Sequence, residues 1–288
     1  MRTIHFTKAE GAQNDFVIVD DRQALLSHEE RQRIVRLISH RRKGVGADGA
    51  IFIDASTECD FIMTFYNPDG SVGSMCGNGG RCAALYVFVN NIAESSMTFE
   101  VLGKTYTARV DGEDVTLSFP PPSRIDPELI LPCEFGDVLL SFVDTGAPHA
   151  VLFAEDLPGS VRNDYHALDM LRIGHALRWH KQFAPVGVNV NVLHVDGNIV
   201  HVRTFEKGVE NETQACGTGS VAAAIAAHIR VGLPPPIMLR THGGEALHVG
   251  FSPNASKKRE STGYYETGLF LQGPAHLVFD GCYVLPNA

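Results

Sequence analysis

Two runs of small apolar residues stand out in the hydrophobic pattern because each directly follows a polar, glycine-rich turn. Residues 83–89 follow the segment 75–82, which contains Cys76, and residues 220–229 follow the segment 215–219, which contains Cys216. A short run that is apolar on all sides and follows such a turn is typical of a buried helix. The pattern therefore predicts a central helix after each turn and places a cysteine at the start of each helix.

The elements around these two helices occur in the same order. Each half reads as a turn running into a strand, an amphipathic helix, a second turn and strand, the small-residue helix and further strands. The equivalent elements are residues 11–19 and 146–153, 29–39 and 165–179, 61–66 and 200–205, and 97–103 and 237–243. The separation is 135 residues at the first turn and reaches 140 at the Thr64-Phe65 and Thr204-Phe205 pairs, where it stays through Cys76 and Cys216 to the last pair of segments. We infer an α+β fold made of two pseudo-symmetric α/β domains, a tandem repeat of one unit.

Three prolines, residues 120–122, are the natural linker because they cannot continue a strand ladder. An alternating segment, residues 276–285, remains after the second repeat is complete, and we expect it to return to the first domain as a strand. The expected domains are thus residues 1–120 with 277–288, and residues 121–276. Residues 252–262 read as a polar hairpin loop.

The composition excludes several classes of protein. A 44% hydrophobic content with 20% charged residues is ordinary for a soluble globular protein, and a net charge of −9 disfavours nucleic acid and anionic membranes as partners. No signal peptide and no membrane span are visible. Six cysteines without a CxxC spacing indicate reduced cytoplasmic thiols, and no metal-ligand set is apparent. The basic run 41–43 is expected to end the helix before it.

Cys76 and Cys216 differ from the other cysteines in their position. The N–H groups and dipole of a helix N-terminus stabilise a thiolate and bind anions, whereas Cys82 lies inside the first helix and is expected to be core. The repeat predicts that the two cysteines face each other across a cleft between the domains. One thiolate would remove a proton from a carbon and the other thiol would return one from the opposite side. The alternatives are a structural disulfide between them or two unrelated core thiols.

At these residues the chain resembles the diaminopimelate epimerases, a PLP-independent amino-acid epimerase family, over essentially its whole length. The matching segments are residues 6–16, 44–49, 67–71, 75–82, 146–149, 187–191 and 205–219. The resemblance implies two similar domains, each a curved, mostly antiparallel sheet around a central helix. It also implies a small-molecule amino-acid substrate and no cofactor, metal, nucleic acid or membrane. A homodimer is the assembly to be tested.

The resemblance also implies a role for individual residues. Cys76 and Cys216 match the acid/base pair, and His149 and Glu206 match the polar groups that assist the thiols. The positions that match substrate-binding residues are Asn14, Asn67, Gly77, Asn78, Asn189, Lys207, Gly217 and Thr218.

Three positions depart from the family pattern. Lys207 stands where the family usually has an arginine that grips the distal carboxylate, Ala147 where it often has asparagine, and Gln13 where it commonly has glycine. Lysine keeps the charge but loses the bidentate fork of arginine. The leading hypothesis is an epimerase that interconverts LL- and meso-diaminopimelate. The runner-up is a racemase of the same fold for another α-amino acid, and a third is a non-catalytic amino-acid-binding protein.

Overall fold

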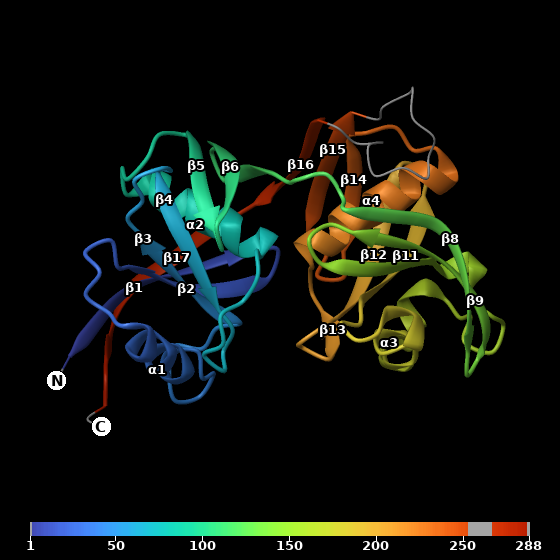
Figure 1. Cartoon of the computed structure of the whole chain (residues 1–288), viewed down its shortest axis with the longest axis horizontal. Helices are drawn as coiled ribbons and strands as arrows, with labels where there is room; N and C mark the ends of the chain where they lie inside the picture. The colour runs from blue at the N-terminus through green and yellow to red at the C-terminus, as the bar shows by residue number, and fades with distance from the viewer. Residues whose placement is uncertain (1, 253–266, 287–288) are drawn as a thin grey trace. The chain divides into compact units, whose positions relative to one another are not determined.

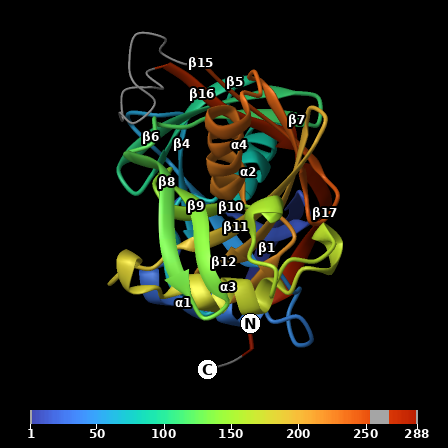
Figure 2. The same ribbon diagram turned by 90° about the vertical axis from the view of Figure 1, so that its right-hand side faces the viewer.

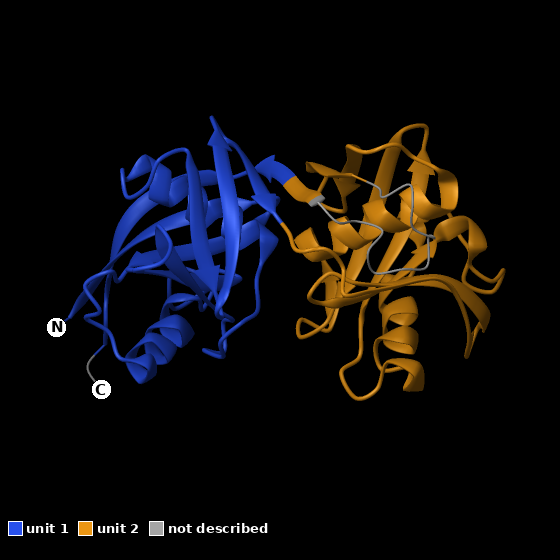
Figure 3. Cartoon of the chain, turned by 45° about the horizontal axis from the view of Figure 1, so that its top comes forward, with its two compact units in different colours: residues 1–118, 272–288 blue, residues 119–271 orange. Residues whose placement is uncertain are grey.

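The computed structural model describes residues 2–252 and 267–286, and the chain divides into two compact units (Figure 3). Unit 1 comprises Met1–Ser118 and Gln272–Ala288, and unit 2 comprises Phe119–Leu271. Both boundaries lie slightly earlier in the chain than the expected ones, so the three prolines belong to unit 2. The predicted hairpin loop, apart from Ser252, lies outside the described residues.

Unit 1 is built on one mixed sheet in the spatial order β17-β1-β2-β3-β4-β5-β6-β7 (Figure 1). The strands are β1 Thr3–Gly11, β2 Asn14–Asp20, β3 Gly49–Asp54, β4 Phe61–Tyr66, β5 Ser96–Val101, β6 Lys104–Asp111, β7 Asp114–Ser118 and β17 His276–Val284. Only the β2–β3 and β4–β5 pairs are parallel. The last strand, β17, pairs with β1, which confirms the predicted return of the chain to its first domain.

Unit 2 repeats this order as β8-β9-β10-β11-β12-β14-β15, again with parallel pairs at the third and fifth junctions. The strands are β8 Arg124–Cys133, β9 Gly136–Asp144, β10 Pro148–Phe153, β11 Asn189–Asp196, β12 Ile199–Glu206, β14 Ile237–Thr241 and β15 Ala246–Ser252. A short strand, β13 Asn211–Thr213, pairs with the end of β12, and β16 Thr267–Pro274 spans the unit boundary. The shared order of strand directions confirms the predicted pseudo-symmetric repeat.

Each unit contains one enclosed helix and one peripheral helix. The enclosed helices are α2 Gly77–Val89 and α4 Gly217–Val231, which are buried on nearly all sides because most of their residues are small or apolar. The peripheral helices, α1 His28–Ile38 and α3 Met170–Arg178, pack one apolar face on the other side of the sheet. Figure 2 turns unit 2 toward the viewer and shows α4 running through its middle.

Two local predictions were wrong in detail. The basic run after α1 does not end that helix, which stops at Ile38; Arg41 instead forms ion pairs with Asp15 and Asp48. The predicted helix 165–179 is divided, because the Asp169 side chain accepts a hydrogen bond from Arg172 N and begins a new helix there. The residues before it form the 3₁₀ turn η2 Tyr165–Ala167, and two further 3₁₀ turns are η1 Ala154–Asp156 and η3 Lys181–Phe183.

No helix in residues 2–252 or 267–286 is long and apolar enough to cross a membrane.

Candidate active site

Cys76 and Cys216 are the N-cap residues of the two enclosed helices, as the sequence predicts. Both have an extended backbone, with φ −107° and ψ 115° at Cys76 and φ −126° and ψ 114° at Cys216. Each carbonyl accepts the first intrahelical hydrogen bond at 2.8 Å, from Gly80 N and Ser220 N respectively. The N–H groups before these bonds and the positive end of the helix dipole therefore lie beside each sulfur. Neither cysteine forms a disulfide.

In unit 1 the structure brings Asn14 to Cys76. The thiol donates to Asn14 Oδ1 at 3.8 Å, and Gly79 N donates to Cys76 Sγ at 3.4 Å. Asn14 Nδ2 donates to Asp48 Oδ2 at 2.8 Å, which fixes the orientation of the amide and turns its carbonyl toward the sulfur. A half-buried thiol with an acceptor and a backbone donor is thus held at the start of α2.

A partly exposed ion-pair cluster supports the loop that carries Asn14. Asp15 pairs with Arg41 at 2.7 Å and with Lys8 at 2.6 Å. Burial raises the pKa of Asp15, but the hydrogen bonds from Arg41 and Lys8 outweigh it and lower the pKa to about 2. Asp15 is consequently ionised at neutral pH and ties β1 and β2 to the loop before β3.

The turn between β1 and β2 is strained. Its two central residues, Ala12 and Gln13, have φ of 55° and 63°. Such a turn has the twist that a two-residue hairpin needs, but positive φ favours glycine or asparagine. Gln13 is the position where the family commonly has glycine, so the departure has a backbone cost here.

Asn67 and Asn78, also predicted to bind substrate, lie in different settings. Asn67 follows β4 in a turn, where its Nδ2 donates to Ser71 Oγ at 3.0 Å. Asn78 is only 1% exposed, and its Oδ1 accepts from Arg81 Nη2 at 3.1 Å. Arg81 is fully buried and also donates to Pro274 O at 3.2 Å. The Asn78 side chain is therefore engaged in a hydrogen bond inside unit 1, and the part of this residue that can face a ligand at the helix start is its backbone.

Cys82 is fully buried inside α2, and burial raises the pKa of its thiol. A thiol that stays protonated and inaccessible is chemically inert, which confirms its prediction as core.

In unit 2 a hydrogen-bonded row of side chains leads to Cys216. Cys216 Sγ lies 3.5 Å from Thr218 Oγ1, and Thr218 Oγ1 lies 3.1 Å from His149 Nε2. His149 is fully buried, and burial alone lowers its pKa to about 3. The imidazole is therefore neutral at physiological pH and contacts the cysteine through the threonine hydroxyl.

The ends of β10, β11 and β12 bring further predicted residues together. Asn189 begins β11 opposite His149 on β10; its Oδ1 accepts from Lys207 N at 2.8 Å and its Nδ2 donates to Pro148 O at 3.3 Å. Glu206 ends β12 half-buried and accepts from Thr213 Oγ1 at 3.0 Å. The neighbouring Lys207 is exposed. Asn189 thus organises the turn that presents Glu206 and Lys207.

Two contributors to the unit 2 site carry no local sequence signal. Asn191 and Thr204 lie in the interiors of β11 and β12, where their side chains continue the row behind His149. Only the pairing of these strands places them there. The repeat aligns Thr204-Phe205 with Thr64-Phe65, but this alignment did not show that the Thr204 side chain belongs to the site.

The third residue after each cysteine, Gly79 or Gly219, packs against the sheet beneath its helix. A Cβ at Gly219 would lie 2.5 Å from Asn191 Oδ1, and one at Gly79 would lie 3.1 Å from Ile51 Cδ1. Both glycines therefore allow close packing of the helix on the sheet beneath it, whereas Gly77 and Gly217 stay at the helix start.

No group of three or more His, Cys, Asp or Glu side chains within residues 2–252 and 267–286 is arranged to hold a metal ion.

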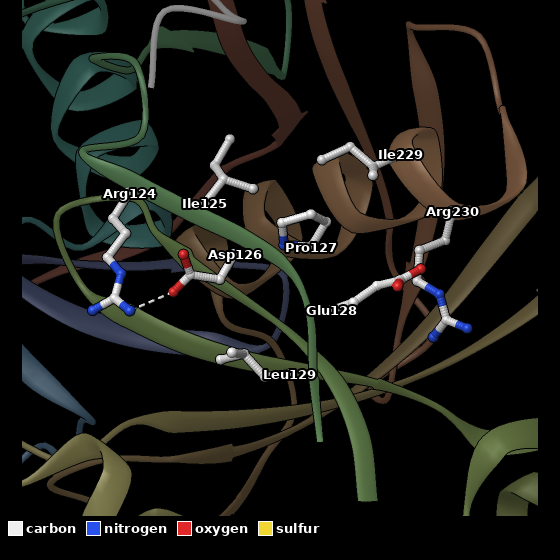
Figure 4. Close-up of a pocket in the computed structure, with 8 residues that line it drawn as sticks. All are labelled: Arg124, Ile125, Asp126, Pro127, Glu128, Leu129, Ile229 and Arg230. Atoms are coloured by element: carbon white, nitrogen blue, oxygen red, sulfur yellow. Dashed lines mark ion pairs between the residues drawn. The ribbon is translucent and has the colours of Figure 1, made fainter. Parts of the chain in front are cut away.

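A cavity of about 890 Å³ in unit 2 lies elsewhere (Figure 4). Residues of β8 and the end of α4 line it, including Arg230 and the ion pair between Arg124 and Asp126 at 2.5 Å. Arg230 is near the C-terminus of α4, roughly 20 Å along the helix from Cys216 at 1.5 Å per residue. The cavity contains no cysteine or histidine, so it is not the site assembled at the helix starts.

Comparisons with known proteins find relatives over nearly the whole chain. The family model described as diaminopimelate epimerase matches residues 6–122 and 141–264. The diaminopimelate epimerase of Chlorobaculum tepidum is 39% identical, over 96% of this chain and 99% of that protein. The diaminopimelate epimerase of Aquifex aeolicus is 36% identical, over 96% of this chain and 97% of that protein.

Solved structures share the fold at low sequence identity. A phenazine biosynthesis protein of the PhzF family from Bacillus anthracis superposes with a TM-score of 0.71 at 15% identity, covering 99% of this chain and 100% of its own. A hydroxyproline epimerase from Agrobacterium vitis superposes with a TM-score of 0.68 at 14% identity, covering 98% of this chain and 92% of its own.

Proposed function

The chain belongs to the diaminopimelate epimerase family, and from this premise we propose that it is a cofactor-independent isomerase that interconverts LL- and meso-diaminopimelate. The observation that supports this most directly is the duplicated geometry: two cysteines, one in each repeat, with the same backbone conformation at the N-cap of an enclosed helix. Binding alone would not need a thiol at both positions, which disfavours a non-catalytic binding protein.

In the proposed reaction the thiolate of one cysteine takes the proton from Cα, and the electron pair of that C–H bond stays on the substrate as a carbanion. The thiol of the other cysteine donates its proton to the opposite face of Cα, which inverts the centre. Each turnover leaves the first cysteine protonated and the second as a thiolate, ready for the reverse direction. Acid and base are both protein groups, so the proposal needs no cofactor.

The helix starts supply the electrostatic part of the proposed mechanism. Negative charge grows on the reacting carboxylate as the carbanion forms, and backbone N–H groups at Gly77, Asn78, Gly217 and Thr218 are suited to stabilise it. The backbone N–H groups of a helix start and the positive end of its dipole also favour the thiolate form of each cysteine. His149, being neutral and fully buried, is assigned to orienting Thr218 rather than to carrying charge.

One observation favours the second candidate, a racemase for another α-amino acid. Diaminopimelate carries a distal carboxylate, and the residue assigned to it, Lys207, is an exposed lysine next to a turn that has Ala147 in place of a polar side chain. A single ammonium group can pair with a carboxylate without the bidentate geometry of arginine. We retain diaminopimelate as the substrate because the family relatives that match the whole chain are named for it.

The diaminopimelate reaction would place the protein in the supply of lysine and of cell-wall precursors. We also propose a cytoplasmic location, because reactive thiols at Cys76 and Cys216 require a reducing compartment.

The substrate is tested by incubating the enzyme in D₂O with LL-diaminopimelate and, separately, with a panel of L-amino acids. Deuterium at Cα is followed by mass spectrometry. We expect exchange with diaminopimelate at a rate far above that with any other amino acid. Exchange with another amino acid alone would establish the racemase, and no exchange with any of them in reducing buffer would exclude both enzymes.

A further inference from the structure

A row of four hydrogen-bonded side chains extends behind Cys216 into the sheet of unit 2. Thr218 on α4 is followed by His149 on β10, Asn191 on β11 and Thr204 on β12, with His149 and Asn191 fully buried and Thr204 3% exposed. Asn191 Nδ2 lies 3.0 Å from His149 Nδ1, and Thr204 Oγ1 donates to Asn191 Oδ1 at 2.9 Å. Strand pairing sets these neighbours, since β10 pairs with β11 and β11 with β12.

The direction of these hydrogen bonds follows from one backbone carbonyl. The amide group of Asn191 that faces His149 Nδ1 also lies 3.4 Å from Ala150 O. A carbonyl oxygen can only accept, so the group facing it must be the NH₂ of the amide. The same NH₂ faces His149 Nδ1, which must therefore accept. A neutral imidazole whose Nδ1 accepts carries its proton on Nε2.

We propose that Asn191, itself oriented by Thr204, is a positioning residue that holds His149 in the Nε2–H form and so directs the hydroxyl hydrogen of Thr218 to Cys216 Sγ. His149 Nε2–H donates to Thr218 Oγ1, and the threonine hydroxyl is left to donate to the sulfur 3.5 Å away. In the other tautomer, Nε2 would take the hydroxyl hydrogen, and the sulfur would lose a donor that stabilises its thiolate. The role of this donor in turnover rests on the proposed function.

Two further features agree with this assignment. Gly219 lacks the side chain that would collide with Asn191, since a Cβ there would lie 2.5 Å from Asn191 Oδ1. The repeat places Ile51 at the position equivalent to Asn191, since Ile51 is the residue that a Cβ at Gly79 would meet, and unit 1 orients the group beside its cysteine differently, through the hydrogen bond from Asn14 to Asp48. This row of hydrogen-bonded side chains is therefore specific to unit 2.

The tautomer is measured directly by NMR on the full-length enzyme labelled with ¹⁵N-histidine, with the His149 signals assigned from their loss in His149→Gln. Two-bond correlations from the ring protons distinguish a protonated from an unprotonated nitrogen. We expect Nε2 protonated and Nδ1 unprotonated at neutral pH. A protonated Nδ1 would overturn the proposal without any variant or any substrate.

The link to Cys216 is tested with Asn191→Asp, whose carboxylate accepts from Nδ1–H, and with Asn191→Leu, which lacks a donor. We expect Asn191→Asp to move the proton to Nδ1, and both variants to slow the alkylation of Cys216 by iodoacetamide, read by peptide mass spectrometry. With diaminopimelate as substrate, kcat should fall roughly ten- to a hundredfold, the effect of one lost hydrogen bond to a charged group, with KM little changed.

Thr204→Val and Thr241→Val form a matched pair, because both residues are buried strand threonines of unit 2. Thr241 Oγ1 has no hydrogen-bond partner among the described residues, whereas Thr204 orients Asn191. We expect Thr204→Val to slow Cys216 alkylation and Thr241→Val to leave it unchanged. Equal effects in the pair, or an unchanged His149 tautomer in Asn191→Asp, would overturn the proposal. Both readouts stand even if diaminopimelate proves not to be the substrate.

Discussion

Replacing the same glycine in the two cysteine motifs should have opposite effects on stability. Gly79 and Gly219 are the third helical residues of α2 and α4. In an exposed helix, Gly→Ala stabilises by about 1 kcal/mol because alanine restricts the unfolded backbone. The nearest atoms to a Cβ at position 79 would be the flexible ends of Ile51 at 3.1 Å and Met63 at 3.3 Å, and Cys76 Cβ would lie at an ordinary contact distance of 3.6 Å. Gly79→Ala should therefore fall between no change and a gain of about 1 kcal/mol.

At position 219 the new Cβ would lie 2.5 Å from Asn191 Oδ1 and 3.2 Å from Cys216 Cβ. Asn191 must move, which costs about 1–3 kcal/mol in overpacking. Its buried partners His149 and Thr204 then lose hydrogen bonds, at about 1–3 kcal/mol for each group left unsatisfied. After the helix gain, the net loss in free energy of unfolding should be about 2–8 kcal/mol.

Differential scanning calorimetry of the two variants and the parent measures this difference. For a unit of about 150 residues, 1 kcal/mol corresponds to roughly 2–4 °C in Tm. Gly219→Ala should lower the Tm of the transition that contains unit 2 by roughly 4–30 °C, and Gly79→Ala should not lower the Tm of the transition of unit 1. A Gly219→Ala protein as stable as the parent would refute the close packing inferred between α4 and β11.

Three further outcomes are expected. Gln13→Gly should raise the free energy of unfolding by about 1 kcal/mol in urea denaturation, because Gln13 has φ 63° and glycine adopts this conformation without steric cost; a loss of stability would contradict this. Asp15→Asn should destabilise the protein at neutral pH. Because the folded pKa of Asp15, about 2, lies below its ordinary value of 3.8, its contribution is complete above pH 4 and is lost as the pH falls through 2, so the stabilities of variant and parent should converge over this range. Lys207→Arg should lower KM for diaminopimelate several-fold with kcat little changed, since the guanidinium pairs with a carboxylate through two hydrogen bonds; an unchanged KM would remove Lys207 from the distal contact.

The helix starts and the repeat could be predicted from the sequence because their signals are local. A polar turn followed by a run of small residues defines the start of α2 and α4, and landmarks at a constant offset reveal the duplication. The divided helix before α3 was missed because an apolar stripe continues across Asp169, and only the cap shows that the chain restarts there.

The parts of the site that could not be predicted depend on contacts between distant segments. In the sequence, Arg81 and Asn78 look like polar residues of the cysteine motif that could face a ligand. In the structure both are buried and hydrogen-bonded to each other inside unit 1. Asn191 and Thr204 read as ordinary polar positions in strands until the pairing of β10, β11 and β12 places them behind His149. The side-chain direction of a motif residue is set by packing, which the order of residues alone does not show.

The use of two thiols is tested most directly by where solvent deuterium appears at the start of the reaction. LL-diaminopimelate is incubated in D₂O with a catalytic amount of enzyme. The reaction is stopped under initial-rate conditions, when only about 5% of the substrate has reacted, and residual substrate and meso product are separated and analysed by mass spectrometry. If one cysteine removes the proton and the other supplies a new one, the meso product carries deuterium at the inverted Cα while the residual LL substrate carries almost none. Cys76→Ser and Cys216→Ser should each abolish product formation. Equal deuterium in substrate and product, or full activity in either variant, would contradict the two-thiol mechanism.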